Sequence, residues 1–464
     1  MDETDRLRTL LRRASDDLGP ITAPAVAELA DRAPATRTAT RRRSVLALVA
    51  AVAVVIGVTA VVLSVRGSGA PRRASVPQRS GAPQRSAALP ELPPYQGPRV
   101  TAAKLETYRW RTLPPAPISA RTDATSVWTG RDVLIWGGMQ GNTLFADGAL
   151  YDPTARTWHK LPPSPLSARI GALATAVDGM VIIWGGENNR QLADGASYDL
   201  STGAWHLLPA PPDDQRAPFG QPGGGAQLVT VGQRALLIRG PQNQTGRTVQ
   251  IAAYDPAHNT WQALPSFTAP ANHDVQQVQA LAVGTTVFVW MLWAHTVPDG
   301  PNGTATSFGI DAEALGTATG RWSVPLRPDL GTDADQAQWT GHDILLPQTN
   351  QWCGYCAGPG LWRTTAALVD PATGKRMLIP PGPASTGGGL VYWTGGAVLS
   401  INLGAIVGSM HPGDTAVWDP ATRKWKPLPP AQTGSPGWQG VSIWTGTRLI
   451  VWAGGAGREF APPG

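Results

Sequence analysis

The sequence predicts an all-β domain made of seven similar four-stranded units, preceded by one apolar helix and a short helical tail. Short apolar runs rich in Val, Ile and Trp alternate with turns containing Gly and Pro from residue 105 onward. Two hairpin-like motifs recur in that region at a period of about 50 residues. One uncharged apolar run, residues 45–65, stands apart from this pattern.

Composition and charge exclude two classes of protein. The chain has 53 Gly and 44 Pro, but they fall between apolar runs and only 15% of residues are charged, so a disordered chain is not expected. Residues 1–100 carry 15 Arg and 8 acidic residues, and the rest of the chain is nearly neutral. Without a basic stripe to follow phosphates, nucleic acid binding is not expected. The 33 Arg against 5 Lys indicate a bacterial, high-GC genome.

The apolar run predicts a transmembrane helix at residues 44–65. It has 21 uncharged residues, 13 of them Val, Leu or Ile, which is enough to cross a bilayer. Three arginines, Arg41 to Arg43, precede it and Arg66 alone follows it directly, which favours a single-pass protein of the cell membrane with its N-terminus in the cytoplasm. A cleaved signal peptide is the alternative, because "RRRSVL" resembles a twin-arginine signal; the long apolar core and acidic leader favour retention.

Segments on both sides of this run have distinct compositions. Residues 1–43 form a cytoplasmic tail with a short amphipathic helix around Leu7, Leu10 and Leu11, which either lies on the membrane or docks a cytoplasmic partner. Residues 66–100 are rich in Pro, Ser and Arg and are predicted to be an extended linker. Residues 101–464 hold the repeats.

The first repeated motif is a strand, a tight turn centred on Gly, and a second strand. It occurs seven times, as "SVWTGRDVLIWGG", "TAVDGMVIIWGG", "LVTVGQRALLIRG", "ALAVGTTVFVWML", "AQWTGHDILLP", "LVYWTGGAVLSIN" and "SIWTGTRLIVWAGG". The second motif follows the first six copies as a further strand, turn and strand, for example "LYDPTARTWHKLPP" and "VWDPATRKWKPLPP". Its turn begins with Asp, which accepts hydrogen bonds, and Pro, which presets φ.

Four strands per unit, Gly-Gly after the second and Tyr-Asp-Pro…Trp across the third and fourth closely resemble the kelch repeat. The resemblance covers residues 105–464 and implies a β-propeller with one four-stranded blade per repeat. Blades four and five depart from it: neither has Gly-Gly, and Met377 replaces the closing Trp of blade five. The seventh copy of the first motif is not followed by a Trp-containing second motif. The segment "ETYRWRTLPP" (106–115) resembles the fourth strand that is missing there. We therefore expect seven blades, closed by the N-terminal segment.

The repeat implies structural roles for its glycines and tryptophans. Gly137-Gly138 and Gly185-Gly186 are expected to turn the backbone through positive φ beside a neighbouring blade. The recurring Trp residues of the outer strands are expected to pack between adjacent sheets, as core side chains and not as a sugar-stacking strip. These residues are Trp158, Trp205, Trp261 and Trp425.

Strand order assigns the loops to two faces. Turns inside the two hairpins share one face and are short, whereas connections from strand two to three and between blades share the other and vary in length. Variable loops on a rigid scaffold commonly bind ligands. The predicted binding loops are 139–147, 187–194, 241–249, 293–307, 348–364 and 403–414. Four of their side chains are candidate contacts: Trp293, His295, Trp352 and Trp362.

Charged residues at equivalent positions allow two interpretations. Asp147, Asp194 and Asp414 each precede the turn Asp by five residues and could share a cation or form strand-end hydrogen bonds; the latter is favoured, because Ca²⁺ takes 6–8 oxygens and these Asp belong to different blades. The arginines at the blade crossings could line the channel mouth for an anionic ligand or hydrogen-bond between blades. They are Arg121, Arg169 and Arg216.

The two cysteines, Cys353 and Cys356, lie in "QWCGYC", which resembles the W-C-G-x-C site of thioredoxins. Redox chemistry there needs a helix N-terminus in an α/β fold, and Pro and Gly flank this pair instead. A structural disulfide is therefore expected outside the cytoplasm, and no zinc site, because two cysteines alone are a poor one. Galactose oxidase is also a kelch-type propeller, but its copper site needs a Cys–Tyr crosslink, and no cofactor is expected here.

The function expected from the sequence is recognition. The propeller is expected to lie outside the cell and to bind a protein or a glycan through the long-loop face. Two alternatives stay open: a carbohydrate-directed oxidase or hydrolase that uses the same face, and a sensor that signals to the cytoplasmic helix.

Overall fold

The computed structural model describes residues 89, 91–212, 225–241, 246–298, 304–323, 337–348, 365–380, 382, 389–402, 414–431 and 440–463. Among these residues, no helix has the length and apolar character needed to cross a bilayer. The apolar run at 44–65, the tail at 1–43 and most of the predicted linker lie outside them.

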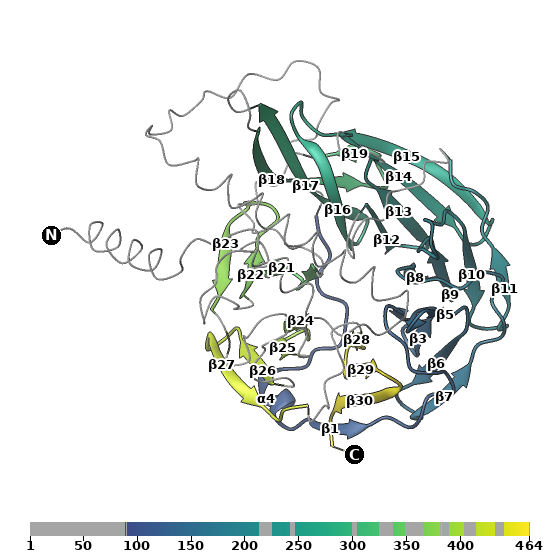
Figure 1. The fold of residues 1–464 in the computed structure, drawn as a ribbon. Helices are drawn as coiled ribbons and strands as arrows, with labels where there is room; N and C mark the ends of the chain where they lie inside the picture. Colours follow the sequence, from purple (N-terminus) through teal and green to yellow (C-terminus); the bar gives the residue numbers. More distant parts are fainter. Residues whose placement is uncertain are drawn as a thin grey trace, which may run out of the picture. The chain divides into compact units, whose positions relative to one another are not determined.

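Seven four-stranded antiparallel sheets make up the domain, as the repeats predict (Figure 1). In order along the chain, blade 1 is β2 (Thr125–Trp128), β3 (Val133–Trp136), β6 (Gly148–Asp152) and β7 (Thr157–Lys160); blade 2 is β8 (Leu173–Val177), β9 (Met180–Trp184), β10 (Gly195–Asp199) and β11 (Trp205–Leu207); blade 3 is β12 (Ala226–Val231), β13 (Arg234–Arg239), β14 (Thr248–Asp255) and β15 (Thr260–Thr268); blade 4 is β16 (Asp274–Val283), β17 (Thr286–Pro298), β18 (Thr304–Gly316) and β19 (Arg321–Trp322). Blade 5 is β20 (Gln338–Trp339), β21 (Ile344–Gln348), β22 (Thr365–Val369) and β23 (Arg376–Ile379); blade 6 is β24 (Gly389–Trp393), β25 (Val398–Asn402), β26 (Thr415–Asp419) and β27 (Lys424–Leu428); blade 7 is β28 (Val441–Trp444), β29 (Leu449–Ala453), β30 (Ala456–Ala461) and β1 (Arg109–Thr112).

Blade 7 contains the closure that the sequence predicts. β1, from the N-terminal side, pairs antiparallel with β30, and Trp110 lies opposite Phe460. Tyr108 and Trp110 both contact the Phe460 ring, with ring centroids 5.4 and 5.2 Å apart. Because the first and last strands share one sheet, β1 supplies the fourth strand of blade 7 and β30 is paired on both sides. The fold class, an all-β seven-bladed propeller, is confirmed.

The first strand of each blade lies nearest the axis of the ring, and neighbouring first strands such as β2, β8 and β12 contact one another. The second strands are mostly buried, and all four residues of β3 are buried. The fourth strands are more exposed: in β7, Trp158 is half-buried and the other three residues are exposed. Apolar clusters fill the spaces between adjacent sheets, so each blade depends on its neighbours for burial.

Gly-Gly pairs end the second strands of blades 1 and 2 in the conformation that the sequence predicts. Gly137 and Gly138 have φ of 70° and 96°, and Gly185 and Gly186 have 70° and 90°. A side chain at Gly186 would lie 2.6 Å from the carbonyl oxygen of Ile170, in the crossing from blade 1 to blade 2. Glycine is therefore required for both its backbone angles and its small size.

The outer-strand tryptophans join successive blades by one repeated hydrogen bond. In six blades the indole N–H of the outer Trp donates to a proline carbonyl at the end of the preceding blade's outer strand. Trp158 donates to Pro114, Trp205 to Pro162, Trp261 to Pro209, Trp322 to Pro265, Trp425 to Pro380 and Trp110 to Pro429, at 2.7–3.2 Å. Blade 5 has Met377 in its outer strand, and no such bond to blade 4 occurs among the described residues. The structural interpretation of these tryptophans is confirmed.

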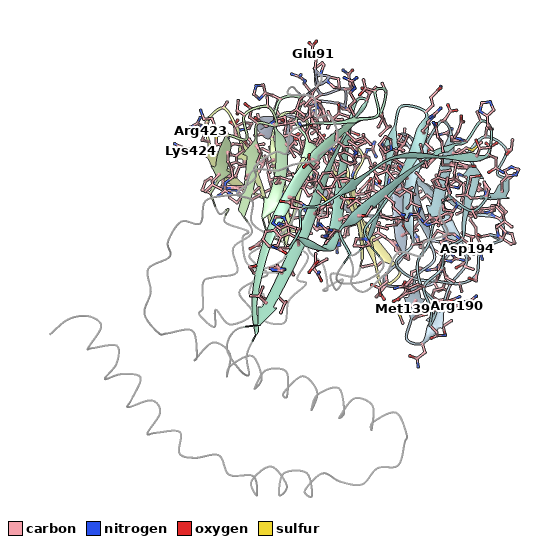
Figure 2. The ribbon with its side chains drawn as sticks, turned by 90° about the horizontal axis from the view of Figure 1, so that it is seen from above. Glu91, Met139, Arg190, Asp194, Arg423 and Lys424 are labelled. Carbon is pink, nitrogen blue, oxygen red and sulfur yellow. The ribbon has the colours of Figure 1, made fainter. Side chains whose placement is uncertain are left out.

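Figure 2 shows the two faces of the propeller. One end carries Arg423 and Lys424, which flank the β26–β27 turn; we call it the short-turn face. The other carries Met139, Arg190 and Asp194 and is the long-loop face. The β17–β18 hairpin of blade 4 also extends toward it.

Two long-loop segments are more ordered than the sequence suggests. Residues 293–307 were expected to be a loop, but β17 and β18 continue through most of it, pairing as far as Pro298 and Thr304; that expectation was wrong. Continued alternation of Thr and apolar residues on both sides of "PDGPNG" lets the two strands pair beyond the ring. The 139–147 loop holds a small hairpin of β4 (Met139–Gln140) and β5 (Thr143–Leu144).

Residues 91–98, which fall in the predicted linker, pack against the short-turn face; we call them the strap. Figure 1 shows the strap as the first coloured part of the chain, crossing the middle of the ring before α4 (Ala102–Glu106). Leu89 and Leu92 pack on the core between blades 4 and 5. Val100 then donates its N–H to Thr394 at 2.8 Å, and α4 packs between blades 6 and 7.

Candidate functional site

On the long-loop face, two buried arginines hold two loop aspartates. Arg121 donates to Asp147 at 2.8 Å, and Arg169 donates to both oxygens of Asp194 at 2.7 and 3.0 Å. Both arginine side chains are fully enclosed, whereas 37% of Asp147 and 52% of Asp194 remain exposed. We call these pairs the Arg–Asp clamps.

The remaining donors of each clamp arginine are also used. Arg169 donates through Nε to the carbonyl of Ser167, through Nη1 to Gly185 and through Nη2 to the Ser167 hydroxyl. Arg121 repeats the pattern with Ser119 and Gly137, and its guanidinium also lies 4.2 Å from the centre of the Phe145 ring. A planar guanidinium suits such a site because its five donors point in fixed directions.

Position explains why the clamps recur. Each arginine lies in the crossing before the first strand of its blade, and each aspartate lies directly before the third strand, β6 or β10. The carbonyl of Arg169 also accepts from Gly138 of blade 1 at 2.9 Å, so this crossing joins two blades. The clamps therefore fix a blade crossing and a long loop to the end of the second strand.

The electrostatics of the clamps favour ion pairing over cation binding. Hydrogen bonds and charge from Arg169 lower the pKa of Asp194 below its usual value. Among the described residues, no three His, Cys, Asp or Glu side chains gather as they would around a metal ion. Asp147 and Asp194 each face an arginine, which already supplies the positive charge that a cation would bring.

The other predicted site residues are spread around the face. Asp414 lies half-buried directly before β26, equivalent to the clamp aspartates. Arg216, Trp352 and Trp362 lie outside the described residues, as do Cys353 and Cys356, so the predicted disulfide stays a prediction. Trp293 and His295 lie on β17, both half-buried. The structure therefore places Trp293 and His295 on a projecting hairpin, away from the clamps of blades 1 and 2.

Trp293 belongs to a cluster that the sequence did not indicate as a unit. The ring of His273 stacks on Trp293, with centroids 3.9 Å apart and an interplanar angle of 13°. His273 Nδ1 lies 2.6 Å from a carboxylate oxygen of Asp311. Gly309, opposite Trp293 in the sheet, leaves room for the indole, because a side chain there would collide with it. We call His273, Trp293 and Asp311 the blade 4 cluster.

Sequence analysis did not select Asp311. The local sequence "GIDAEAL" does not distinguish Asp311 from any other polar strand residue that contacts an adjacent strand. Its role depends on β17 and β18 pairing so that Asp311 lies opposite Met291, two positions from Trp293. Nothing in the local sequence specifies that pairing.

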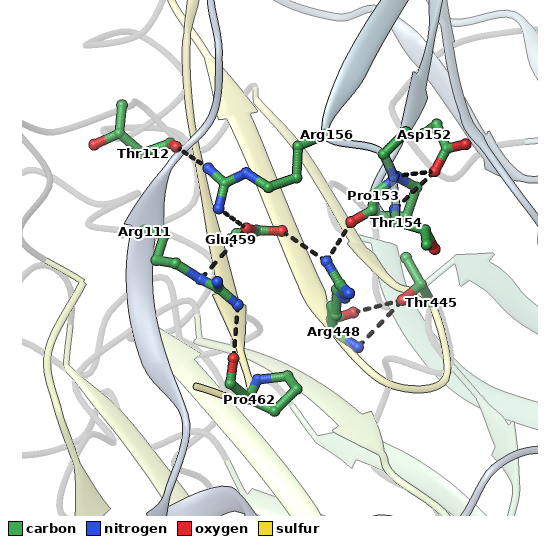
Figure 3. A network of polar contacts seen from close by, with 11 residues as sticks. Arg111, Thr112, Asp152, Pro153, Thr154, Arg156, Thr445, Arg448, Glu459 and Pro462 are labelled. Atoms are coloured by element: carbon green, nitrogen blue, oxygen red, sulfur yellow. Dashed lines mark hydrogen bonds and ion pairs between the residues drawn. The ribbon is translucent and has the colours of Figure 1, made fainter. Parts of the chain in front are cut away.

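A second charged cluster lies at the ring closure, on the side of the short turns, and Figure 3 shows it. Glu459 of β30 is completely buried and forms ion pairs with Arg156 at 2.6 Å, Arg111 at 3.5 Å and Arg448 at 3.5 Å. Arg156 also donates to the carbonyl of Thr112. The cluster joins blade 7 to the β6–β7 turn of blade 1, and burial together with the Glu459 charge raises the pKa of the nearby Tyr151 to about 12. It is a structural site, which sequence analysis did not find.

Comparison with known families agrees with the repeat pattern. Residues 99–291 match a family model described as the KLHDC2/KLHL20/DRC7 Kelch-repeats domain. The match runs from the end of the strap into β17 and covers less than half of the chain. No curated protein matches the chain in sequence. Residues 99–291 are therefore similar to a kelch-repeat domain, and the seven four-stranded sheets show that the folded domain is a seven-bladed β-propeller.

Proposed function

We propose that the propeller is a recognition module that binds a protein partner through its long-loop face. The observation that carries this proposal is the difference between the two faces. The strap packs across the short-turn face, whereas the long-loop face presents the β17–β18 hairpin and the clamped loops. Rigid loops on a propeller bind with a small loss of conformational entropy, which favours affinity.

Within this proposal, the clamp residues position the loops and other side chains contact the partner. Arg121 and Arg169 are fully enclosed, so they hold Asp147 and Asp194 in place rather than reach outward. Exposed side chains suited to contact are Gln140, Glu187, Arg190, Thr296, Thr306 and Ser307. His295 and the blade 4 cluster add an aromatic surface of the kind enriched in protein interfaces.

Site-specific photo-crosslinking tests the proposal. A photoreactive amino acid replaces Arg190 on the long-loop face or His295 in β17 of the projecting hairpin, and Lys424 serves as the matched position on the short-turn face. We expect one protein to be crosslinked from Arg190 and His295 and not from Lys424. Crosslinks from Lys424 alone would contradict the proposal. A different outcome is that the propeller binds a purified glycan and that substitution of Arg190 or His295 lowers this affinity. The partner would then be a sugar and not a protein.

We also propose that residues 44–65 anchor the protein in a bacterial cell membrane, with residues 1–43 in the cytoplasm and the propeller outside. Support comes from the sequence: an uncharged run of 21 residues and the arginines before it. Protease added to intact cells should digest the propeller and leave the tail protected. Release of the propeller by alkaline carbonate, or protection of the propeller in intact cells, would contradict this arrangement.

A further inference from the structure

The strap occupies four of seven equivalent positions on the short-turn face. In each blade, the turn between the first two strands contains a glycine with φ between 58° and 99°. These are Gly130, Gly179, Gly232, Gly284, Gly341, Gly395 and Gly446. Pro93, Tyr95 or Pro98 packs directly against the glycines of blades 4 to 7. At the glycines of blades 1 to 3, no described atom lies within 4 Å of where a side chain would begin.

Blades 1, 5, 6 and 7 share a "WTG" motif at this turn, which adds an indole beside the glycine. In blade 5, Trp339 donates its indole N–H to the carbonyl of Pro93 at 2.8 Å, and Tyr95 lies over Gly341. The strap thus binds to blade 5 in two ways. The carbonyl of Pro93 accepts a hydrogen bond from an indole, and the ring of Tyr95 packs on a turn whose glycine has no side chain. The outer strands use the same bond between indole and proline carbonyl.

Blade 1 offers the same two features with nothing bound to them. Trp128 occupies the position of Trp339, and its indole N–H has no hydrogen-bond partner among the described residues. Trp393 and Trp444 are the other two indoles of the motif, but their N–H groups are enclosed by protein. Within the described part of the chain, Trp128 is therefore the indole of this motif whose donor is free and accessible.

A pocket of about 430 Å³ lies between Trp128 and the strap. Its walls include four indoles and one phenol, from Trp128, Trp339, Trp393, Trp444 and Tyr95, together with Pro98. Among the described residues, no charged side chain lines it. A charged ligand would lose hydration here without gaining a counter-ion, so the pocket favours a neutral guest with apolar rings.

Two polar side chains of the pocket, Gln338 and Thr445, are already engaged, which leaves few partners for a sugar. Gln338 donates to the carbonyl of Val391 at 2.7 Å and accepts from the backbone N–H of Trp393 at 2.6 Å. The hydroxyl of Thr445 donates to the carbonyl of Arg448. Sugar hydroxyl groups would be desolvated without new partners, whereas a peptide needs one donor for its carbonyl and flat surfaces for its rings.

We propose that this pocket binds a proline-rich extended peptide, with a peptide carbonyl accepting from Trp128 and proline rings packed between the indoles. The site lies on the opposite face from the proposed protein-binding loops and does not depend on them. Proline-rich chains are pre-organised as polyproline II helices, expose their carbonyls and dock in aromatic grooves. The strap, with Pro93, Pro94 and Pro98, is a segment of this chemistry bound on blades 4 to 7, beside the open positions of blades 1 to 3.

A peptide with the sequence of residues 89–98, LPELPPYQGP, is the probe, titrated by calorimetry into the full-length chain. We expect saturable binding that does not change with salt. Trp128→Phe keeps the ring and removes the donor, so affinity should fall about fivefold, the usual effect of one lost hydrogen bond. Trp158→Phe is the matched control in the same blade, because its donor is already used by Pro114, and affinity should not change.

A peptide with alanine in place of its four prolines should bind at least tenfold more weakly. Equal binding of the alanine peptide would overturn the proposal and leave a general apolar pocket. Equal binding to the wild-type chain and to Trp128→Phe would also overturn it. If Trp339→Phe lowers affinity and Trp128→Phe does not, the peptide replaces the strap and no second site exists.

Discussion

At the scale of single residues, the clamp arginines show how a charged side chain can be fully buried in a small β-domain. Arg169 has no exposed surface, yet each of its nitrogens donates to a carbonyl, a hydroxyl or Asp194. A lysine could not replace it, because one ammonium group cannot reach acceptors in these separate directions. The aspartate supplies the compensating charge, and its exposed edge keeps the pair partly hydrated.

Asp194→Asn should therefore destabilise the propeller. The substitution leaves the Arg169 charge buried without a counter-ion, and we expect a loss of about 1–2 kcal/mol in unfolding free energy at pH 7, at the lower end for buried pairs because Asp194 is half-exposed. Urea unfolding of both proteins measures the loss. Asp178→Asn in the same blade is the control: Asp178 is exposed with φ of 49°, which asparagine adopts readily.

The effect should also depend on pH. Because Arg169 lowers the pKa of Asp194 in the folded protein, the pair stabilises the fold at neutral pH, and that contribution is lost as pH falls through the lowered pKa, below about pH 4. The stability difference between wild type and Asp194→Asn should shrink from pH 7 to pH 3. A difference that stays constant or grows on acidification would show that charge pairing is not its cause.

Cys353 and Cys356 give a second prediction at this scale, which depends on sequence alone. If the propeller lies in an oxidising compartment, the two thiols should form a disulfide. Mass spectrometry of the non-reduced protein, purified with thiols blocked, should find it lighter by two hydrogen atoms and without added blocking groups. Two blocked cysteines would contradict the prediction.

At the scale of the strand, the hydrogen bond from indole to proline carbonyl explains why Trp and Leu-Pro recur together. Each blade contributes one donor to the blade before it and one acceptor to the blade after it. The junction of blades 4 and 5 is the exception, because Met377 has no side-chain N–H to donate. The strap bridges that junction instead: Leu92 packs on the core between blades 4 and 5, and Pro93 accepts from Trp339.

Trp425→Phe tests the contribution of one such bond. Phenylalanine retains an aromatic ring but removes the donor to Pro380, so the unfolding free energy should fall by about 1 kcal/mol or somewhat more from the smaller ring. Chemical denaturation measures it. Trp128→Phe is the matched control, since its N–H has no partner among the described residues, and it should cost less. An equal loss in the two variants would mean that ring size, and not the hydrogen bond, decides stability.

Strands were predictable from sequence where a local residue pattern marked each of them. Alternating apolar residues, Gly turns and Asp-Pro turns located the seven blades, and a stray Trp-Arg-Thr-Leu-Pro-Pro located the closing strand. The β17–β18 extension, the strap and the contact between His273 and Asp311 were not predicted. Each depends on which distant segment lies opposite, and residue type alone does not specify that. Residues 91–98 are Pro-rich and have the composition of a linker. They pack on the propeller because the glycine turns beneath them leave room for their rings.

At the scale of the whole molecule, stability depends on closing the ring between blade 7 and blade 1. Two devices act there. β1 completes the sheet of blade 7, and Glu459 binds three arginines that come from β1, from the β6–β7 turn and from the β28–β29 turn (Figure 3). Because one buried carboxylate connects both sides of the junction, loss of its charge should weaken the closure more than loss of any single surface pair.

Glu459→Gln is therefore expected to be the most destabilising of these substitutions. It keeps the shape of the side chain but leaves Arg111, Arg156 and Arg448 near one another without their common counter-ion, a loss of about 3–5 kcal/mol for a fully buried group. Glu106→Gln provides a matched control: Glu106 also joins an N-terminal element to the ring, through Lys426 at 2.7 Å, but both side chains are well exposed and the substitution should change stability little.

Hydrogen exchange distinguishes a weakened ring closure from a general loss of stability. In Glu459→Gln the amides of β1 and β30 should exchange before those of blades 2 and 3, because the ring opens where the first strand pairs with the last. Uniform acceleration in all blades, or equal effects of the two Glu→Gln substitutions, would show that the carboxylate is not what holds the closure.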